Sequence, residues 1–100
     1  MAKAGSIVED SASPGEQLAH ELVHADQRLR SGPLDTTPSI HSFSAGGVNY
    51  QEREASKEFR AVGYSGFSQR GDISENQIRR ELGVRPRATY NTRDKWQRVP

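Results

Sequence analysis

With 100 residues, 32% of them hydrophobic, the chain is long enough for one small domain with a thin core. Its net charge of +1 excludes a strong general attraction to nucleic acid or membrane, and the absence of cysteine excludes disulfides and thiolate metal sites. No apolar run approaches the ~20 residues of a membrane helix, and residues 1–15 lack the apolar centre of a Sec-type signal peptide. We expect a protein that is secreted or delivered into a target cell by a non-Sec route, or is otherwise cytoplasmic.

The first predicted helix has clear signals at both of its ends. Ser13 is a candidate N-cap, Pro14 suits the first helical position, and Glu16 stands where a capping-box glutamate reaches back. The sequence SGP at 31–33 terminates the helix.

Two more helices are predicted further along the chain. Residues 32–48 are loop-like, although SIHSF within them alternates as a brief strand does. Asn49 is a candidate N-cap for a second helix that ends before Gly63. Ser74 caps a short third helix, which Gly83 closes.

These elements predict a mainly α fold, α+β at most, with three helices, long loops and at most one short hairpin or edge strand. We expect residues 1–12 to form a flexible tail or a short edge strand, residues 13–90 to form the domain, and residues 91–100 to form a basic C-terminal tail.

The first helix carries the motif His-Glu-x-x-His at His20, Glu21 and His24. Residues four apart are neighbours on one helix face, so both imidazoles can bind a single zinc ion. The intervening glutamate can hold a water molecule at the zinc and take its proton. By chance alone the motif falls in roughly one chain in a few hundred of this length, so two solvent-facing histidines are the alternative.

The helical wheel separates the histidines from an apolar stripe. The stripe has the spacing i, i+4, i+7, i+11 and consists of Leu18, Leu22, Ala25 and Leu29. Because His20 and His24 lie nearly opposite, we expect the helix to pack through its leucines while the histidines face a cleft.

A catalytic zinc site needs a third protein ligand. The downstream candidates are His41, Glu52, Glu54, Glu58 and Glu75. Glu58 is preferred, because it borders the apolar face of the second predicted helix between Ala55 and Val62, where a side chain can reach a neighbouring helix. The alternative for Glu58 is a surface carboxylate paired with Lys57 or Arg60.

Three stretches together resemble one protein family. HELVHA at 20–25, KEFRAVG at 57–63 and ISENQIRRELGVRPRATY at 73–90 are similar, in this order, to the NleD-like effector-type zinc metallopeptidases of bacteria. The resemblance implies a minimal zincin-like fold, a Zn²⁺ cofactor and a protein substrate. It also implies that His20, His24 and Glu58 are the zinc ligands and Glu21 the general base.

Hydrolysis also needs a donor to the oxyanion. The candidates are Tyr90, Tyr64, His41, Arg79 and Arg85. Tyr90 ranks first because it matches the terminal tyrosine of the family pattern, and core packing is the alternative for each tyrosine. Glu54 and Asp26 are candidate hydrogen-bond partners for the zinc-bound histidines. We expect Asn76, Arg79 and Glu81 to form a structural polar brace.

These observations favour a zinc-dependent endopeptidase that acts on a protein substrate as a secreted effector or toxin. A catalytically inactive zinc-binding interaction module is the alternative. Nucleic-acid binding through the basic C-terminal segment, with Tyr90 and Trp96 as stacking residues, is disfavoured because Glu81 and Asp94 interrupt the positive charge. A membrane partner is not expected.

Overall fold

The computed structural model describes residues 14–100, which form three helices and a three-stranded antiparallel sheet. The predicted N-terminal tail, the Ser13 cap and the capping side chain of Glu16 lie outside the described part. The elements are α1 (Pro14–Ser31), β1 (Pro38–Ala45), β2 (Val48–Ala55), α2 (Ser56–Val62), α3 (Glu75–Glu81), the 3-10 helix η1 (Arg93–Lys95) and β3 (Gln97–Arg98). The prediction of a mainly α fold is therefore wrong, because the chain is α+β.

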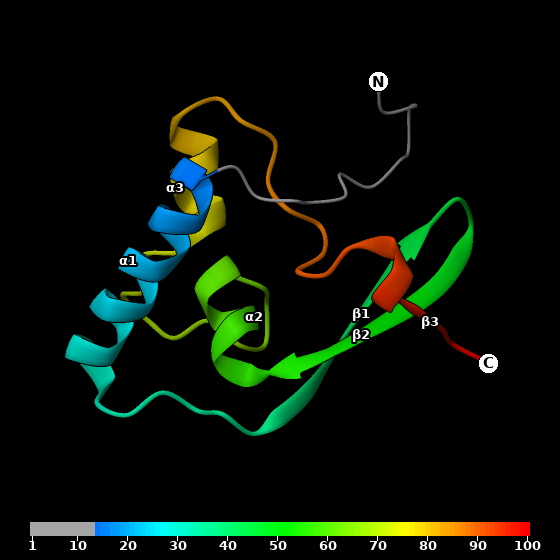
Figure 1. Ribbon diagram of the computed structural model, residues 1–100, viewed down its shortest axis with the longest axis horizontal. Helices are drawn as coiled ribbons and strands as arrows, with labels where there is room; N and C mark the ends of the chain where they lie inside the picture. The colour runs from blue at the N-terminus through cyan, green and yellow to red at the C-terminus, as the bar shows by residue number, and fades with distance from the viewer. Residues whose placement is uncertain (1–13) are drawn as a thin grey trace.

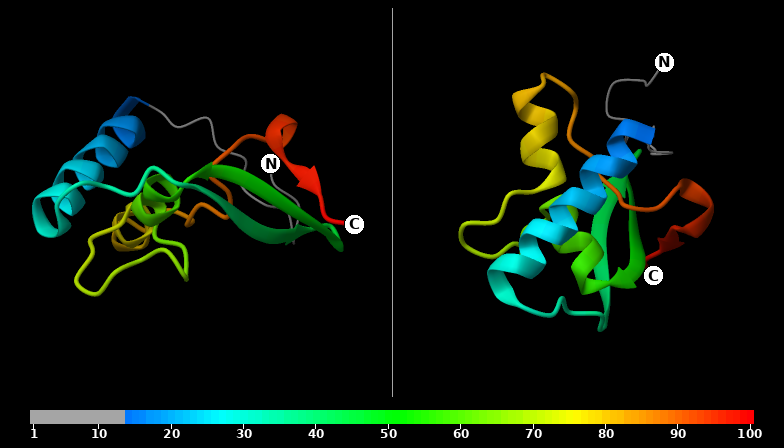
Figure 2. Two further views of the ribbon diagram at one scale, coloured as in Figure 1. Left: turned by 90° about the horizontal axis from the view of Figure 1, so that it is seen from below. Right: turned by 60° about the vertical axis from the view of Figure 1, so that its left-hand side comes forward.

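Figure 1 shows the three helices gathered at one end and the β1–β2 hairpin extending away from α2. In Figure 2, α3 lies alongside α1, and the chain returns from α3 towards the sheet. No helix within residues 14–100 has both the length and the apolar character needed to cross a membrane.

The hairpin replaces the first half of the second predicted helix, which was expected to begin at Asn49. Gly46 and Gly47 have φ angles of 57° and 79°, and they connect the strands in a two-residue turn of the kind that favours hairpins. Eight cross-strand pairs follow, from Ala45 with Val48 to Pro38 with Ala55. Pairing along the whole strand outweighs the weak local helical preference of residues 49–55, so the helix begins only at Ser56.

Residues 91–100 contribute to the sheet. β3 pairs with β2 in the register Tyr50 with Arg98, and the indole of Trp96 packs edge-on against Phe43 at 4.8 Å between ring centroids. This aromatic contact holds the C-terminal segment on the hairpin.

The face through which α1 packs differs from the prediction. The leucines of the stripe are exposed, with Leu22 61% and Leu29 87% accessible, whereas Val23 and Gln27 are buried. The amide of Gln27 donates to the backbone carbonyls of Arg60 and Ile73, at 3.2 and 3.1 Å. The buried face of α1 is therefore partly polar, and its hydrogen bonds to α2 and to the segment before α3 replace leucine packing.

The apolar core is small and centres on α2. Phe59 and Val62 are fully buried beside Tyr64, with Phe67 and Tyr90 packed against them. His41 stacks on Tyr64 at 3.9 Å between ring centroids, so this histidine belongs to the core.

Both predicted helix boundaries around residues 63–74 are confirmed. Gly63 is the C-cap of α2 with a φ of 102°, and its N–H donates to the carbonyl of Phe59. Ser74 is the N-cap of α3, and its Oγ accepts from the backbone N–H of Gln77 at 3.2 Å. The two caps define where α2 ends and where α3 begins.

Candidate metal centre

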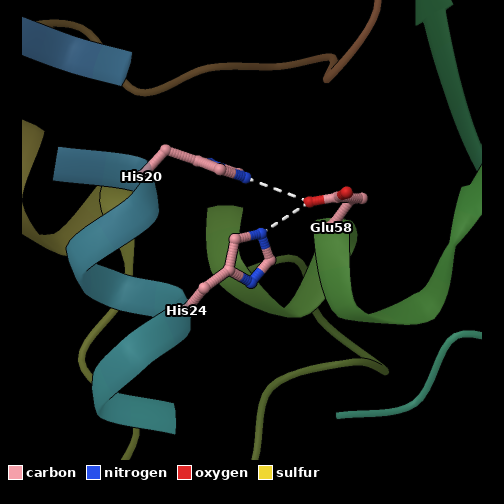
Figure 3. Close-up of side chains that lie close together, drawn as sticks. All are labelled: His20, His24 and Glu58. Atoms are coloured by element: carbon pink, nitrogen blue, oxygen red, sulfur yellow. Dashed lines mark hydrogen bonds and ion pairs between the residues drawn. The ribbon is translucent and has the colours of Figure 1, made fainter. Parts of the chain in front are cut away.

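His20 and His24 project from the packed side of α1 towards the first turn of α2. Because they are one turn apart, their rings approach edge to face at 4.6 Å between centroids. Figure 3 shows that Glu58 reaches from α2 to a point between them. Its Oε1 lies 3.1 Å from His20 Nε2 and 2.6 Å from His24 Nε2. One ligand atom from each of the three residues lies within 4.8 Å of the other two.

The other acids considered as third ligands have different places. Glu52 is fully buried and accepts from His41 and from the backbone N–H groups of Tyr90 and Asn91. His41 is thereby held in the core. Glu54 lines a cleft beside His20.

The surface pairing considered for Glu58 is also replaced. The guanidinium of Arg60 forms two hydrogen bonds with the carboxylate of Asp72, at 2.9 and 2.8 Å. This ion pair anchors the loop before α3 to α2 and leaves Glu58 directed at the histidines.

The second nitrogen of His20 is held by an acid on α3. His20 Nδ1 donates to Glu75 Oε1 at 2.8 Å, and Glu75 is 2% exposed. An ionised carboxylate only accepts, so Nδ1 carries a proton, and the Nε2 atom faces Glu58. Neither acid suggested for this role takes it, because Asp26 accepts from Arg30 and Glu54 lies in the cleft.

Hydrogen bonds between the histidines and the carboxylates shift the pKa values of His20 and Glu58. Burial lowers the pKa of His20, but hydrogen bonds to Glu58 and Glu75 outweigh this and raise the pKa to about 9. Hydrogen bonds from His20 and His24 lower the pKa of Glu58 to about 2. The centre therefore keeps an ionised Glu58 carboxylate beside a cationic His20 ring at neutral pH.

The arrangement fits a zinc ion. Two imidazole nitrogens and one carboxylate oxygen are a known donor set of catalytic zinc. Both rings approach the same carboxylate oxygen of Glu58, and a cation held there would take the place of the protons that lie between them. Within residues 14–100 the buried Nδ1 of His24 has no hydrogen-bond partner, so the polar contact that orients this ring is its approach to Glu58.

A cleft of about 710 Å³ lies beside His20. Glu21 and Tyr90 both line it, with Glu54, Arg87 and Lys95 among the other lining residues. The ring of Tyr90 is 5.6 Å from that of His20. Burial, together with the nearby Glu58 and Glu54, raises the pKa of Tyr90 to about 12. The phenol therefore keeps its proton at neutral pH and remains a hydrogen-bond donor.

The other candidate oxyanion donors are engaged elsewhere or exposed. Tyr64 stacks on His41, and Arg79 donates to Glu75 at 3.1 Å. Arg85 is exposed, and its carbonyl accepts from Arg79. The structure therefore brings Tyr90, rather than these residues, to the cleft.

The sequence did not reveal the hydrogen-bonding roles of three residues around the centre: Glu52, Glu75 and Arg87. Glu75 was considered only as a metal ligand, and its hydrogen bond to His20 depends on how α3 packs against α1. The expected brace on α3 is present in part. The Asn76 amide donates to the carbonyl of Arg87 and accepts from its N–H, at 3.0 and 2.7 Å. Glu81 only accepts weakly from Gln77, at 3.5 Å.

The comparison with protein families identifies the chain. No curated protein and no solved structure gives a significant match. The model of one family, Peptidase_M91, described as effector protein, matches residues 2–90. The match covers the histidine motif, Glu58 and the segment that ends in Tyr90, and it confirms the resemblance to NleD-like effector peptidases. The chain belongs to the Peptidase_M91 family of effector proteins.

Proposed function

We propose that the protein is a zinc-dependent endopeptidase that hydrolyses peptide bonds of a protein substrate as a secreted bacterial effector. The observation that carries this proposal is the convergence of His20, His24 and Glu58 within 4.8 Å, beside a cleft lined by Glu21 and Tyr90. Membership of a peptidase family supports the reaction class.

His20 and His24 would hold the zinc ion through Nε2, and Glu58 would hold it through its carboxylate. The chemistry that the site gains with zinc bound is that of a Lewis acid, which polarises a carbonyl group and lowers the pKa of water. The choice of zinc rests on the donor set, since imidazole and carboxylate together suit this borderline ion.

Glu21 acts as the general base. It accepts a proton from the water that attacks the peptide carbonyl and then delivers that proton to the leaving amine. The carbonyl oxygen gains negative charge as the new C–O bond forms, and the phenol of Tyr90 donates a hydrogen bond to it. The raised pKa of Tyr90, about 12, supports this role because a donor must retain its proton.

A peptide library digested by the zinc-loaded protein and read by mass spectrometry tests the proposal. Glu21→Gln is expected to bind zinc as the wild type does while cleavage falls at least 10²-fold. Asp26→Asn is the matched control, because Asp26 lies on the same helix and pairs with Arg30. This control is expected to cleave normally.

Two results would contradict the proposal. Full cleavage by Glu21→Gln would show that Glu21 is not the general base. Zinc binding by the wild type without cleavage of any peptide would instead favour a catalytically inactive zinc-binding interaction module.

A further inference from the structure

Glu75 is a buried carboxylate at the point where three segments meet. It begins α3, is 2% exposed, and uses both oxygens. Oε1 accepts from His20 Nδ1 at 2.8 Å, and Oε2 accepts from Arg79 Nε at 3.1 Å. Arg87 NH1 lies within 3.2 Å of both oxygens. One acid therefore faces one imidazole and two guanidinium groups.

Arg87 continues this network to the other wall of the cleft. Its NH2 donates to the backbone carbonyl of Tyr90 at 2.7 Å, and its guanidinium lies 5.3 Å from the centroid of the Tyr90 ring. Asn76 holds the backbone of Arg87 on α3 through two hydrogen bonds. The backbone N–H of Tyr90 is bound separately by Glu52. Tyr90 is thus fixed at both backbone polar groups, and one of these links leads to Glu75.

We propose that Glu75 is a positioning residue: it orients the His20 ring for the metal ion and, through Arg87, sets the distance between that ring and Tyr90. This inference rests on the proposed function. A carboxylate that accepts from Nδ1 fixes the tautomer with Nε2 free to bind metal, and it increases the basicity of the ring. Arg87 gives Glu75 its direction, because the guanidinium is itself anchored at both ends.

A purely structural role for Glu75 would be to neutralise the two buried arginines. That role predicts a loss of stability when Glu75 changes but no specific loss of zinc affinity in the protein that remains folded. The two roles therefore separate in a binding measurement.

The first experiment measures the zinc dissociation constant of the full chain by competition with a chromophoric chelator. Glu75→Gln keeps the size of the side chain but loses its charge, and zinc binding is expected to weaken 10–100-fold. Glu81→Gln is the matched control, because Glu81 is an exposed acid on the same helix, and its dissociation constant is expected to stay within twofold.

The second experiment observes the imidazole rings by two-bond ¹H–¹⁵N NMR of the zinc-loaded protein. In the wild type, His20 is expected to show a slowly exchanging Nδ1 proton and a metal-bound Nε2. This measurement remains decisive if Glu75→Gln does not fold. Zinc bound through Nδ1 of His20 would overturn the proposal.

A third comparison tests whether Arg87 acts through Glu75. Arg87→Lys keeps the charge but cannot bind Glu75 and Tyr90 in the same geometry. It is expected to weaken zinc binding several-fold in the wild-type background and to have no further effect in Glu75→Gln, since coupled residues are non-additive. Additive losses would overturn the coupling.

Failure of this inference differs from failure of the proposed function. Normal zinc affinity in a folded Glu75→Gln protein would overturn the positioning role alone. A wild-type protein that binds no zinc would overturn the proposed function and, with it, this inference.

Discussion

Gly63 links the end of α2 to the start of the helix that supports the candidate metal centre. Its φ of 102° lies in the region that side chains disfavour. A Cβ atom at this position would meet Ser74 Oγ at 2.5 Å and Ser74 Cβ at 2.7 Å. Gly63→Ala must therefore displace the residue that caps α3 and directly precedes Glu75.

The cost of this substitution has three parts. The left-handed backbone costs about 1–2 kcal/mol for a residue with a Cβ atom. The overlap with Ser74 costs a further 1–3 kcal/mol or so, as overpacking does. Loss of the hydrogen bond from Gln77 N–H to Ser74 Oγ removes a cap worth about 1 kcal/mol. We expect Gly63→Ala to lower the free energy of unfolding by about 3–6 kcal/mol, a large part of the stability of a domain of this size.

Urea unfolding followed by circular dichroism measures this loss. Gly71→Ala is the matched control, because Gly71 also has a positive φ, of 86°, but no atom lies within 4 Å of the position of its Cβ. The free energy of unfolding of Gly71→Ala should fall only by the cost of the left-handed backbone, about 1–2 kcal/mol. Equal losses in the two variants would refute the close contact between Gly63 and Ser74.

Three further predictions concern the ion pair, the face of α1 and the cleft. Asp72→Asn breaks the buried pair with Arg60 and should cost about 3 kcal/mol at pH 7. Arg60 lowers the pKa of Asp72, so the stabilisation by the Asp72 carboxylate is present above the unfolded pKa of 3.8 and is lost as the pH falls. In urea titrations, the free energy of unfolding of Asp72→Asn should therefore depend less on pH between 5 and 2 than that of the wild type. Leu22→Gln should change the free energy of unfolding by no more than about 0.5 kcal/mol, whereas Val23→Ala should cost about 1–3 kcal/mol in thermal unfolding; the reverse order would contradict the packing of α1. Tyr90→Phe should lower kcat for peptide hydrolysis about 10²–10³-fold at unchanged zinc affinity, and a kcat equal to that of the wild type would exclude Tyr90 as the oxyanion donor.

The sequence predicted the helices around the site better than it predicted the sheet. The ends of α2 and α3 at Gly63 and Ser74 follow from local chemistry, since a left-handed residue and a side-chain cap each act within a few residues. The β1–β2 hairpin depends on pairing across the whole length of two strands. Its local signal, Gly46-Gly47 between alternating segments, was present but was assigned to a loop.

The prediction of how α1 packs was wrong because burial was inferred from hydrophobicity alone. Among the side chains of α1 that the structure describes, Val23 is the buried apolar one, and its neighbours on the packed face are His20 and Gln27. These polar groups are buried because Glu75 and backbone carbonyls satisfy them, and such partners cannot be read from the periodicity of one helix.

The choice of Glu58 followed from the sequence even though the helix that carries it is shorter than expected. Its place depends on the first turn of α2, which the prediction included. The position of Glu75 depends on how α3 docks against α1, and helical spacing within α3 carries no information about that contact.

Anomalous diffraction from crystals of the zinc-loaded protein tests the central claim most directly. The account predicts one zinc peak per chain, at about 2.0–2.2 Å from His20 Nε2, His24 Nε2 and a carboxylate oxygen of Glu58. A peak that lies away from these three atoms, or no peak at saturating zinc, would contradict it.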